Sequence, residues 1–244
     1  MPPFVTTIMT NFLKFDINEH LKNKYPKLTE EHIDLIASDV KQRWDYRELI
    51  DSVDFKCKQT AYYANIELGE GGFKYKVAVK WETVPPGYAW REVAAVAADS
   101  RDNVYVFNRG PHPMIVFDSD GNFLKSWGED VFSRPHGVSV GPNDTLYCTD
   151  DGDHTVRQCT LDGKVLMTIG VPGQPAEYQS GQPFNRCTHV ALDPKTGELY
   201  VSDGYGNSRI HKFTPDGTLL FSWGGPGTDP GEFNIPHTLS LIHI

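Results

Sequence analysis

Cysteine pairs, long apolar runs and clusters of basic residues are all lacking from this sequence. No CxxC spacing occurs among its 4 cysteines, so a thiolate-held metal cluster is not expected. The apolar runs are far shorter than the roughly 20 residues that a membrane-spanning helix needs, and the opening MPPFVTTIMTNFLKF lacks the basic start and apolar core of a secretion signal. We therefore expect a soluble, cytoplasmic protein that does not associate with a membrane.

Positive charge is scarce and dispersed. Asp and Glu number 32 against 23 Lys and Arg, which gives a net charge of -9. No stretch groups enough bases to neutralise several phosphates, and such neutralisation drives binding to nucleic acids. A nucleic acid is not an expected partner.

The cysteines lie inside apolar or alternating segments, at Cys57, Cys148, Cys159 and Cys187. Free cysteine is among the most buried residue types, so this placement predicts buried thiols. One disulfide between Cys148 and Cys159, across a hairpin, is the alternative.

Residues 1–55 have the character of a helical extension. Apolar side chains recur at helical spacing in LTEEHIDLIASDVKQRWDYRELI, at Ile33, Ile36, Val40 and Trp44. Thr29 precedes them as a helix cap, so the segment predicts an amphipathic helix. Its apolar face is expected to pack on the main domain or on a protein partner. Residues 56–89 are interpreted as a linker that contains the strand FKYKVAVKW.

From residue 90 onward the chain repeats a pattern of four short strands. The complete units are REVAAVAADSRDNVYVFNRGPHPMIVFDSDGNFLKSWG, RPHGVSVGPNDTLYCTDDGDHTVRQCTLDGKVLMTIG and NRCTHVALDPKTGELYVSDGYGNSRIHKFTPDGTLLFSWG. Within each unit, alternating apolar and polar residues are divided by turn signals. The closing glycines Gly128, Gly170 and Gly224 lie 42 and 54 residues apart, a spacing typical of four-stranded β-propeller blades.

This pattern resembles the NHL-type six-bladed β-propeller family over residues 80–244. The resemblance implies an all-β fold in which residues 90–244 supply about three and a quarter blades of a partial propeller. IPHTLSL would be the innermost strand of a fourth blade, and FKYKVAVKW is the candidate for the strand that closes the ring. We expect a C-terminally truncated propeller.

One repeat position carries two histidines. Aligning the innermost strands places Ala94, His136, Thr188 and His237 at equivalent positions. Because innermost strands line the channel of a propeller, we expect His136 and His237 to face each other across it. Three neutral imidazoles and an open position make a catalytic zinc site, whereas two make a weak one. The alternative is that each Pro-His ends a loop and packs at the channel mouth.

Within the NHL group the chain resembles the peptidyl-α-hydroxyglycine α-amidating lyase family. Members of that family cleave a C-terminal hydroxyglycine to leave a peptide amide and glyoxylate. The resemblance lies in VFNRGPHP, RPHGVSV, NIPHTLSL and, most specifically, ELYVSDGYGNSRIHKF. It implies zinc ligands at His136 and His237, a catalytic Tyr205 and Arg109, and calcium-binding backbone carbonyls at Val96 and Val138.

These residue types suit the implied reaction on a peptide or small-molecule substrate. A zinc ion acidifies a bound hydroxyl, a tyrosinate serves as general base, and an arginine holds a carboxylate by two hydrogen bonds. Zinc is therefore the expected cofactor, with calcium as the second ion. The alternatives are that Tyr205 only braces a turn with Gly204 and Gly206, and that Arg109 pairs with a neighbouring acid.

This sequence departs from the family pattern at residues that concern the zinc site and a disulfide. The family's third zinc histidine belongs to a later blade, and His189 points away by strand alternation, so we do not expect it to substitute. Gly206 stands where the family has a disulfide cysteine. We expect this chain to be inactive as given, and a non-enzymatic NHL-repeat propeller that acts as a binding scaffold is the alternative function.

Three acidic residues in CTDDGDHT supply the kind of oxygen ligands that a calcium loop uses: Asp150, Asp151 and Asp153. Their spacing matches no complete calcium-loop pattern, and hairpin turns favour Asp and Gly in any case. The segment predicts a polar turn.

Overall fold

The chain divides into two compact units, residues 1–81 and residues 82–244. The computed structural model describes residues 67–68, 71–72, 74–76 and 81–241. The predicted helical extension over residues 1–55 lies outside the described residues, as does Cys57. The boundaries predicted for the extension, the linker and the repeats stay predictions.

The described part of the first unit is a small antiparallel pairing between β1 (Glu67–Leu68) and β2 (Tyr75–Lys76). The β2 residues belong to FKYKVAVKW, the candidate closing strand. The remainder of that segment is largely outside the described residues, so its role in closing a ring stays a prediction.

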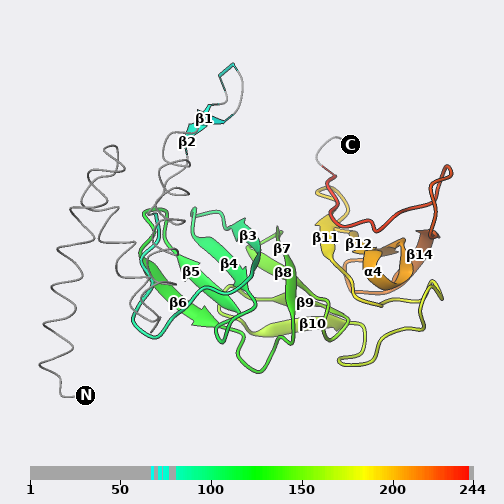
Figure 1. The fold of residues 1–244 in the computed structure, drawn as a ribbon, viewed down its shortest axis with the longest axis horizontal. Helices are drawn as coiled ribbons and strands as arrows, with labels where there is room; N and C mark the ends of the chain where they lie inside the picture. Colours follow the sequence, from blue (N-terminus) through cyan, green and yellow to red (C-terminus); the bar gives the residue numbers. More distant parts are fainter. Residues whose placement is uncertain (1–66, 69–70, 73, 77–80, 242–244) are drawn as a thin grey trace, which may run out of the picture. The chain divides into compact units, whose positions relative to one another are not determined.

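The second unit contains three antiparallel sheets of four strands each (Figure 1). Blade 1 comprises β3 (Val93–Ala98), β4 (Val104–Asn108), β5 (Met114–Phe117) and β6 (Phe123–Trp127). Blade 2 comprises β7 (Pro135–Gly141), β8 (Thr145–Asp150), β9 (Thr155–Cys159) and β10 (Val165–Ile169). Blade 3 comprises β11 (His189–Leu192), β12 (Leu199–Asp203), β13 (Arg209–Phe213) and β14 (Leu219–Gly224). In every blade each strand pairs with the next along the chain.

Polar turns join the strands, as the turn signals predict. Between β5 and β6, the Asp118 carboxylate accepts the backbone N–H groups of Asp120 and Asn122 at 3.0 and 2.8 Å. Gly121 adopts a φ of 83°, a conformation that glycine takes at little steric cost. Short-range chemistry therefore fixes where each hairpin reverses.

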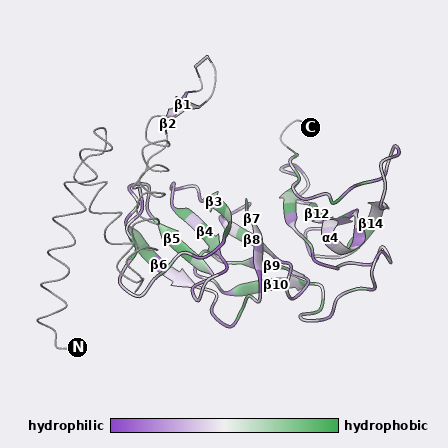
Figure 2. Cartoon of the chain, in the orientation of Figure 1, coloured by the Kyte–Doolittle hydropathy of each residue, from purple (hydrophilic) through white to green (hydrophobic). Residues whose placement is uncertain are grey.

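The apolar core lies between neighbouring blades. One cluster joins blades 1 and 2 and contains Tyr105, Phe107, Met114, Val116, Trp127, Val138, Leu146, Cys148 and Cys159. A second joins blades 2 and 3 and contains Tyr147, Val156, Ile169, Phe184, Cys187, Val190, Leu199, Val201 and Phe213. Hydrophobic colouring accordingly concentrates on the strands, and hydrophilic colouring on the loops between them (Figure 2). Burial of these faces against each other holds the blades side by side.

The all-β, blade-like fold predicted from the sequence is confirmed. The innermost strand β7 contacts both β3 and β11, so the three innermost strands are neighbours. The number of blades in a complete ring is not tested and stays a prediction. Among the described residues, no helix has the length and apolar character needed to cross a membrane.

The prediction of free thiols is confirmed for Cys148, Cys159 and Cys187, which are buried and unpaired. Burial raises the pKa values of the Cys148 and Cys187 thiols well above their usual range. The alternative disulfide between Cys148 and Cys159 does not form. These thiols serve packing between the blades.

Candidate active site

A β-bulge at the start of β7 positions His136. The register of β7 against β8 passes from Pro135 opposite Asp150 to Gly137 opposite Thr149, which leaves His136 unpaired. Blade 1 has the same irregularity at Ala94. A bulge turns one side chain out of the regular alternation, so the equivalence predicted for these two residues has a structural basis.

The His136 ring is oriented by a carbonyl oxygen from the neighbouring blade. Its Nδ1 lies 2.8 Å from the Thr188 backbone oxygen, and a carbonyl oxygen only accepts. Nδ1 therefore carries the proton, and Nε2 is left with its lone pair available. This is the arrangement by which metal-ligating histidines are commonly fixed in one tautomer.

Electrostatics favour the neutral form of this ring. Burial lowers the pKa of His136, and the nearby His237 and Arg109 lower it further, against opposing contributions from Asp151 and the Thr188 hydrogen bond. The side chain is largely buried within the described residues. A neutral imidazole is the form that binds metal ions or accepts a proton.

Tyr205 lies in a single helical turn, α4 (Gly204–Asn207), directly after β12. A Cβ atom at Gly204 would come within 2.1 Å of the Pro236 carbonyl oxygen, and one at Gly206 within 2.2 Å of the Asn185 side chain. Both flanking positions consequently require glycine. In the GYG segment, Tyr205 therefore lies between two chain segments that approach closely. The alternative in which Tyr205 only braces a β-turn does not match the structure, where the residue lies in a helical turn.

Two histidine nitrogens converge on the Tyr205 hydroxyl. The oxygen lies 3.2 Å from His136 Nε2 and 3.0 Å from His237 Nε2. The two imidazole centroids are 4.7 Å apart. The rings are thus in direct contact, and the expectation that they face each other across a channel is wrong in that respect. We call His136, Tyr205 and His237 the tyrosine–histidine cluster.

The segment that carries His237 is held by side chains of blade 3. The Ser202 hydroxyl donates to the His237 carbonyl oxygen at 3.2 Å, and the Thr188 hydroxyl to that of Pro236 at 3.4 Å. The prediction of a strand in IPHTLSL is wrong for the described residues, which contain no strand there, because no backbone ladder pairs with them. Side-chain bonds place His237 instead.

The donor atoms of the cluster fit two positions of a zinc site. Both imidazoles direct Nε2 toward one place, which the phenol oxygen shares. Within the described ranges, no group of three or more His, Cys, Asp and Glu residues is arranged to hold a metal ion. His189 contacts Ser139 through Nε2 and the Leu239 amide through Nδ1, so its ring is engaged elsewhere, as expected.

The residues expected at the calcium site occupy equivalent register positions in adjacent blades. Val96 lies opposite Val106 in blade 1, and Val138 lies opposite Cys148 in blade 2. Their backbone carbonyls belong to neighbouring innermost strands. Calcium binding by these carbonyls stays a prediction.

Arg109 follows β4 and reaches toward the start of β7. Its Nε donates to the Pro135 carbonyl oxygen at 2.9 Å, next to His136. Its Nη1 lies 2.7 Å from the Glu92 carboxylate, and this hydrogen bond and the guanidinium charge lower the pKa of Glu92. The alternative of pairing with a neighbouring acid is what the structure contains.

One set of residues that support the site is not among those predicted from the sequence. The last residue of the second strand in each blade accepts a backbone N–H from the loop that precedes the innermost strand. Asn108 accepts from Arg91 at 3.1 Å and Asp150 from Ser133 at 2.6 Å. Asp203 accepts from Asn185 at 2.9 Å. The signal was available, because VFN, CTD and VSD recur at one place in the repeats.

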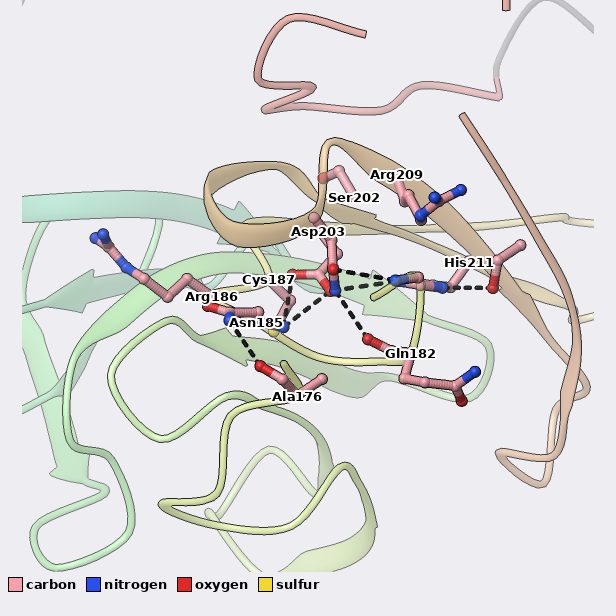
Figure 3. Close-up of polar contacts among 12 residues, drawn as sticks. Ala176, Gln182, Asn185, Arg186, Cys187, Ser202, Asp203, Arg209 and His211 are labelled. Carbon is pink, nitrogen blue, oxygen red and sulfur yellow. Dashed lines mark hydrogen bonds and ion pairs between the residues drawn. The ribbon is translucent and has the colours of Figure 1, made fainter. Parts of the chain in front are cut away.

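Asp203 also anchors a buried chain of side chains. Figure 3 shows Asn185 and His211 directed toward its carboxylate. His211 Nε2 lies 3.2 Å from the carboxylate, and Nδ1 lies 2.6 Å from the Ser222 hydroxyl. Although this Asp–His–Ser order resembles a hydrolase triad, His211 is 0% exposed, so a substrate has no access to it. We call Asp203, His211 and Ser222 the buried aspartate chain.

The acidic run of blade 2 is a turn, as predicted, but it is not a solvated one. Asp150, Asp151 and Asp153 are 0%, 1% and 8% exposed. Asp153 pairs with Arg157 at 2.5 Å, and the Asp151 carboxylate contacts two arginines. Buried carboxylates need such partners.

Comparison with known proteins confirms both resemblances. Residues 184–213 match the family model described as NHL repeat. The chain is 31% identical over 205 residues to peptidyl-glycine alpha-amidating monooxygenase of Mus musculus, an alignment covering 70% of this chain and 20% of that protein. It is 37% identical over 160 residues to peptidyl-alpha-hydroxyglycine alpha-amidating lyase 1 of Drosophila melanogaster, covering 59% of this chain and 29% of that one.

Similarity extends to proteins named only for their repeats. The chain is 31% identical over 179 residues to NHL repeat-containing protein 3 of Homo sapiens, covering 68% of this chain and 51% of that protein. Among solved structures, virginiamycin B lyase of Staphylococcus aureus aligns with a TM-score of 0.43 and 12% identity over 55% of this chain and 42% of that one. The chain spans between 20% and 51% of the length of the relatives named here.

Proposed function

We propose that this chain is a peptidyl-α-hydroxyglycine α-amidating lyase-like protein, of the kind that cleaves a carbinolamide to an amide and glyoxylate, and that its two imidazoles alone give little or no turnover. The observation that carries the proposal is the convergence of His136 and His237 on the Tyr205 hydroxyl at 3.2 and 3.0 Å. These three residues come from segments far apart in the sequence, and the similarity to lyases gives the arrangement a chemical purpose.

Tyr205 is proposed as the general base of this reaction. Cleavage of a carbinolamide removes the hydroxyl proton as the amide nitrogen leaves, so a proton acceptor must contact that hydroxyl. Tyr205 has its oxygen at the centre of the cluster, 3.2 Å from His136 Nε2 and 3.0 Å from His237 Nε2, and a cation held by these two nitrogens would stabilise the tyrosinate that a general base requires. Arg109 is proposed to position His136 through the Pro135 carbonyl, which it holds at 2.9 Å.

His136 and His237 are the proposed zinc ligands of this chain. When bound, zinc supplies a Lewis acid that acidifies the substrate hydroxyl. The hydrogen bond from His136 Nδ1 to Thr188 fixes the ring for this role. The carbonyls of Val96 and Val138 are proposed to contribute to a calcium site that joins blades 1 and 2.

Zinc titration tests the proposal. We expect the purified chain to bind one zinc ion per molecule, measured by calorimetry and by metal analysis after dialysis. Replacing either ligand, in His136→Gln or His237→Gln, should weaken zinc binding by more than the roughly 10- to 100-fold that loss of a ligand's outer-shell partner costs, since one of two imidazoles is lost. The matched control is His112→Gln, because His112 instead contacts Glu129 at 2.7 Å and stacks on Tyr88.

Equal zinc affinity in the wild type and in His136→Gln would contradict the assignment of the ligands. Zinc-dependent release of glyoxylate from a hydroxyglycine peptide, absent in Tyr205→Phe, would establish the reaction class. Binding of zinc without turnover would retain the metal site and agree with the inactivity expected of this chain.

A binding scaffold is the second candidate, favoured by a different observation. The outer strand β14 exposes apolar side chains: Leu219, Leu220, Phe221 and Trp223 are 38%, 45%, 53% and 36% exposed. An exposed apolar stripe of this kind is typical of an interaction surface. A chain that binds no zinc in the titration above would leave this function as the one to pursue.

A further inference from the structure

Two arginines occupy equivalent places beside the tyrosine–histidine cluster. Arg134 precedes His136 by two residues, and Arg186 precedes Thr188, the residue aligned with His136, by two residues. Across the four segments this place holds Glu92, Arg134, Arg186 and Ile235. A second set of equivalent positions directly follows the second strand of each blade, β4, β8 or β12, and holds Arg109, Asp151 and Gly204. The repeat therefore brings several charged groups to one end of the blades.

One buried carboxylate fixes both arginines. Asp151 Oδ2 lies 2.5 Å from Arg134 Nη1 and 3.0 Å from Arg186 Nη2. The Asp151 side chain is 0% exposed, whereas each arginine side chain is 43% exposed. Blade 3 has Gly204 where blade 2 has Asp151, so Arg186 uses the carboxylate of the neighbouring blade. We call Arg134 and Arg186 the arginine pair.

The arginine pair retains a positive charge that Asp151 does not neutralise. Two guanidinium groups share a single carboxylate, which leaves one unit of charge. In the part of the chain that the structure describes, each guanidinium makes one side-chain hydrogen bond, to Asp151, although a guanidinium has five donors. The other carboxylate oxygen, Asp151 Oδ1, is buried without a hydrogen-bond partner among these residues. Donors therefore exceed acceptors at this place.

Arg109, in contrast, already has a carboxylate partner of its own. Its Nη1 is paired with the Glu92 carboxylate at 2.7 Å, and its Nε is bound to the Pro135 carbonyl. A carboxylate arriving at Arg109 must displace Glu92, whereas one arriving at the arginine pair meets unused donors. Bidentate pairing between arginine and carboxylate is strong in partly buried sites.

The arginine pair adjoins the tyrosine–histidine cluster directly. The Arg186 Cζ atom lies 4.6 Å from the centre of the Tyr205 ring. Figure 3 shows the Arg186 side chain pointing away from the buried aspartate chain. Because Tyr205 contacts both histidines, an anion held by Arg186 would lie next to the proposed reacting groups.

We propose that the arginine pair, rather than Arg109, receives a carboxylate at this site. The ligand class is a small carboxylate adjoining an amide, such as the C-terminus of a glycine-extended peptide. Only the naming of this group as the substrate's terminal carboxylate rests on the proposed lyase function. Binding of the anion follows from the charges and donors described above.

Calorimetry with N-acetylglycine tests the proposal on the full chain in chelator-treated buffer without zinc. We expect a dissociation constant on the order of 1 mM for the wild type. Arg186→Gln and Arg134→Gln should each weaken binding by about 10-fold, the loss typical of a charge-assisted hydrogen bond. Arg109→Gln and Arg101→Gln should change it less than about 2-fold, since Arg101 pairs with Asp99 away from the cluster.

N-acetylglycinamide, which lacks the carboxylate, should not bind. Arg186→Lys keeps the charge and should bind with intermediate affinity, and circular dichroism should confirm that every variant is folded. Loss of binding in Arg109→Gln with retention in Arg186→Gln overturns the proposal, and so does equal binding of the amide. No detectable binding by the wild type at ten times the expected dissociation constant overturns it as well. Failure to bind zinc leaves this result unaffected, so the two proposals fail independently.

Discussion

The buried aspartate chain and the tyrosine–histidine cluster are both built around histidine, yet their hydrogen bonds differ in kind. In the buried aspartate chain, His211 donates through Nε2 to a carboxylate and accepts through Nδ1 from a hydroxyl, so every group has its complement. In the cluster, two imidazole nitrogens share one hydroxyl, that of Tyr205. The first arrangement is complete and the second leaves capacity to bind.

The difference separates residues that hold the fold from residues that can react. His211 and Asp203 are each 0% exposed and connect three strands of blade 3. The cluster lies where α4, the start of β7 and the segment of His237 meet, and no strand passes through all three. Changes in the first group should therefore affect stability, and changes in the second should affect ligands.

The largest expected effect is on the stability of Asp203→Ala. The substitution removes a buried carboxylate that accepts bonds from Asn185, Asn207 and His211. We expect the free energy of unfolding to fall by about 3–5 kcal/mol, as when one partner of a buried pair is removed. Urea denaturation followed by circular dichroism measures it. A loss below that of Tyr205→Phe would reverse the comparison.

Added zinc should act on the cluster alone. At about 100 times its dissociation constant, a ligand of the folded state raises the free energy of unfolding by about 2.7 kcal/mol. The wild type should show this shift in thermal denaturation and lose it with chelator. His211→Gln should start from a lower stability and still gain from zinc, whereas His136→Gln should not. A gain in His136→Gln equal to that of the wild type would place the metal elsewhere.

A smaller effect is expected for Gly204→Ala, which acts on the contact between blade 3 and the segment of His237. The new methyl group would lie 2.1 Å from the Pro236 oxygen, so that segment must shift. We expect a loss of about 1–3 kcal/mol in unfolding free energy, typical of overpacking, and a reduced affinity for zinc. Gly225→Ala is the matched control, because no atom lies within 4 Å of its Cβ position. Unchanged zinc affinity in Gly204→Ala would show that His237 does not contribute.

The smallest expected effect is the change in stability of Tyr205→Phe. This variant removes a hydroxyl whose two hydrogen bonds are partly exposed, which costs about 0.5–1 kcal/mol. Denaturation should therefore detect little, and any glyoxylate release should be abolished. A loss as large as that of Asp203→Ala would mean that the cluster serves the fold.

The strands of the repeats were predictable because they depend on local signals. Alternation and Asp–Gly turns specify a hairpin within a few residues, as Asp118 does for its turn. The segment of His237 was not predictable in the same way, because a strand exists only where another backbone pairs with it. The apolar pattern of IPHTLSL resembles the earlier repeats, but its bonds in the structure come from Ser202 and Thr188 side chains.

The candidate site likewise contains features that the sequence predicts and features that depend on packing between blades. Alignment of the repeats placed His136 and His237 together, and the resemblance added Tyr205, but none of these indicated that the rings touch. The arginine pair was missed because Arg186 takes its carboxylate from another blade, at Asp151. Partners that lie a full repeat apart are set by the packing of blades, and a single sequence does not encode that packing in any short motif.

The shared place of Glu92, Arg134 and Arg186 in the repeat has a consequence for how this site can change. Each residue lies on its own blade, outside the strands and the cores between them. One substitution at one such place alters the charge beside the reacting groups without replacing any residue of a strand. Selectivity for ligands can thus evolve, or be engineered, one blade at a time. Each step needs a single substitution outside the strands that form the sheets.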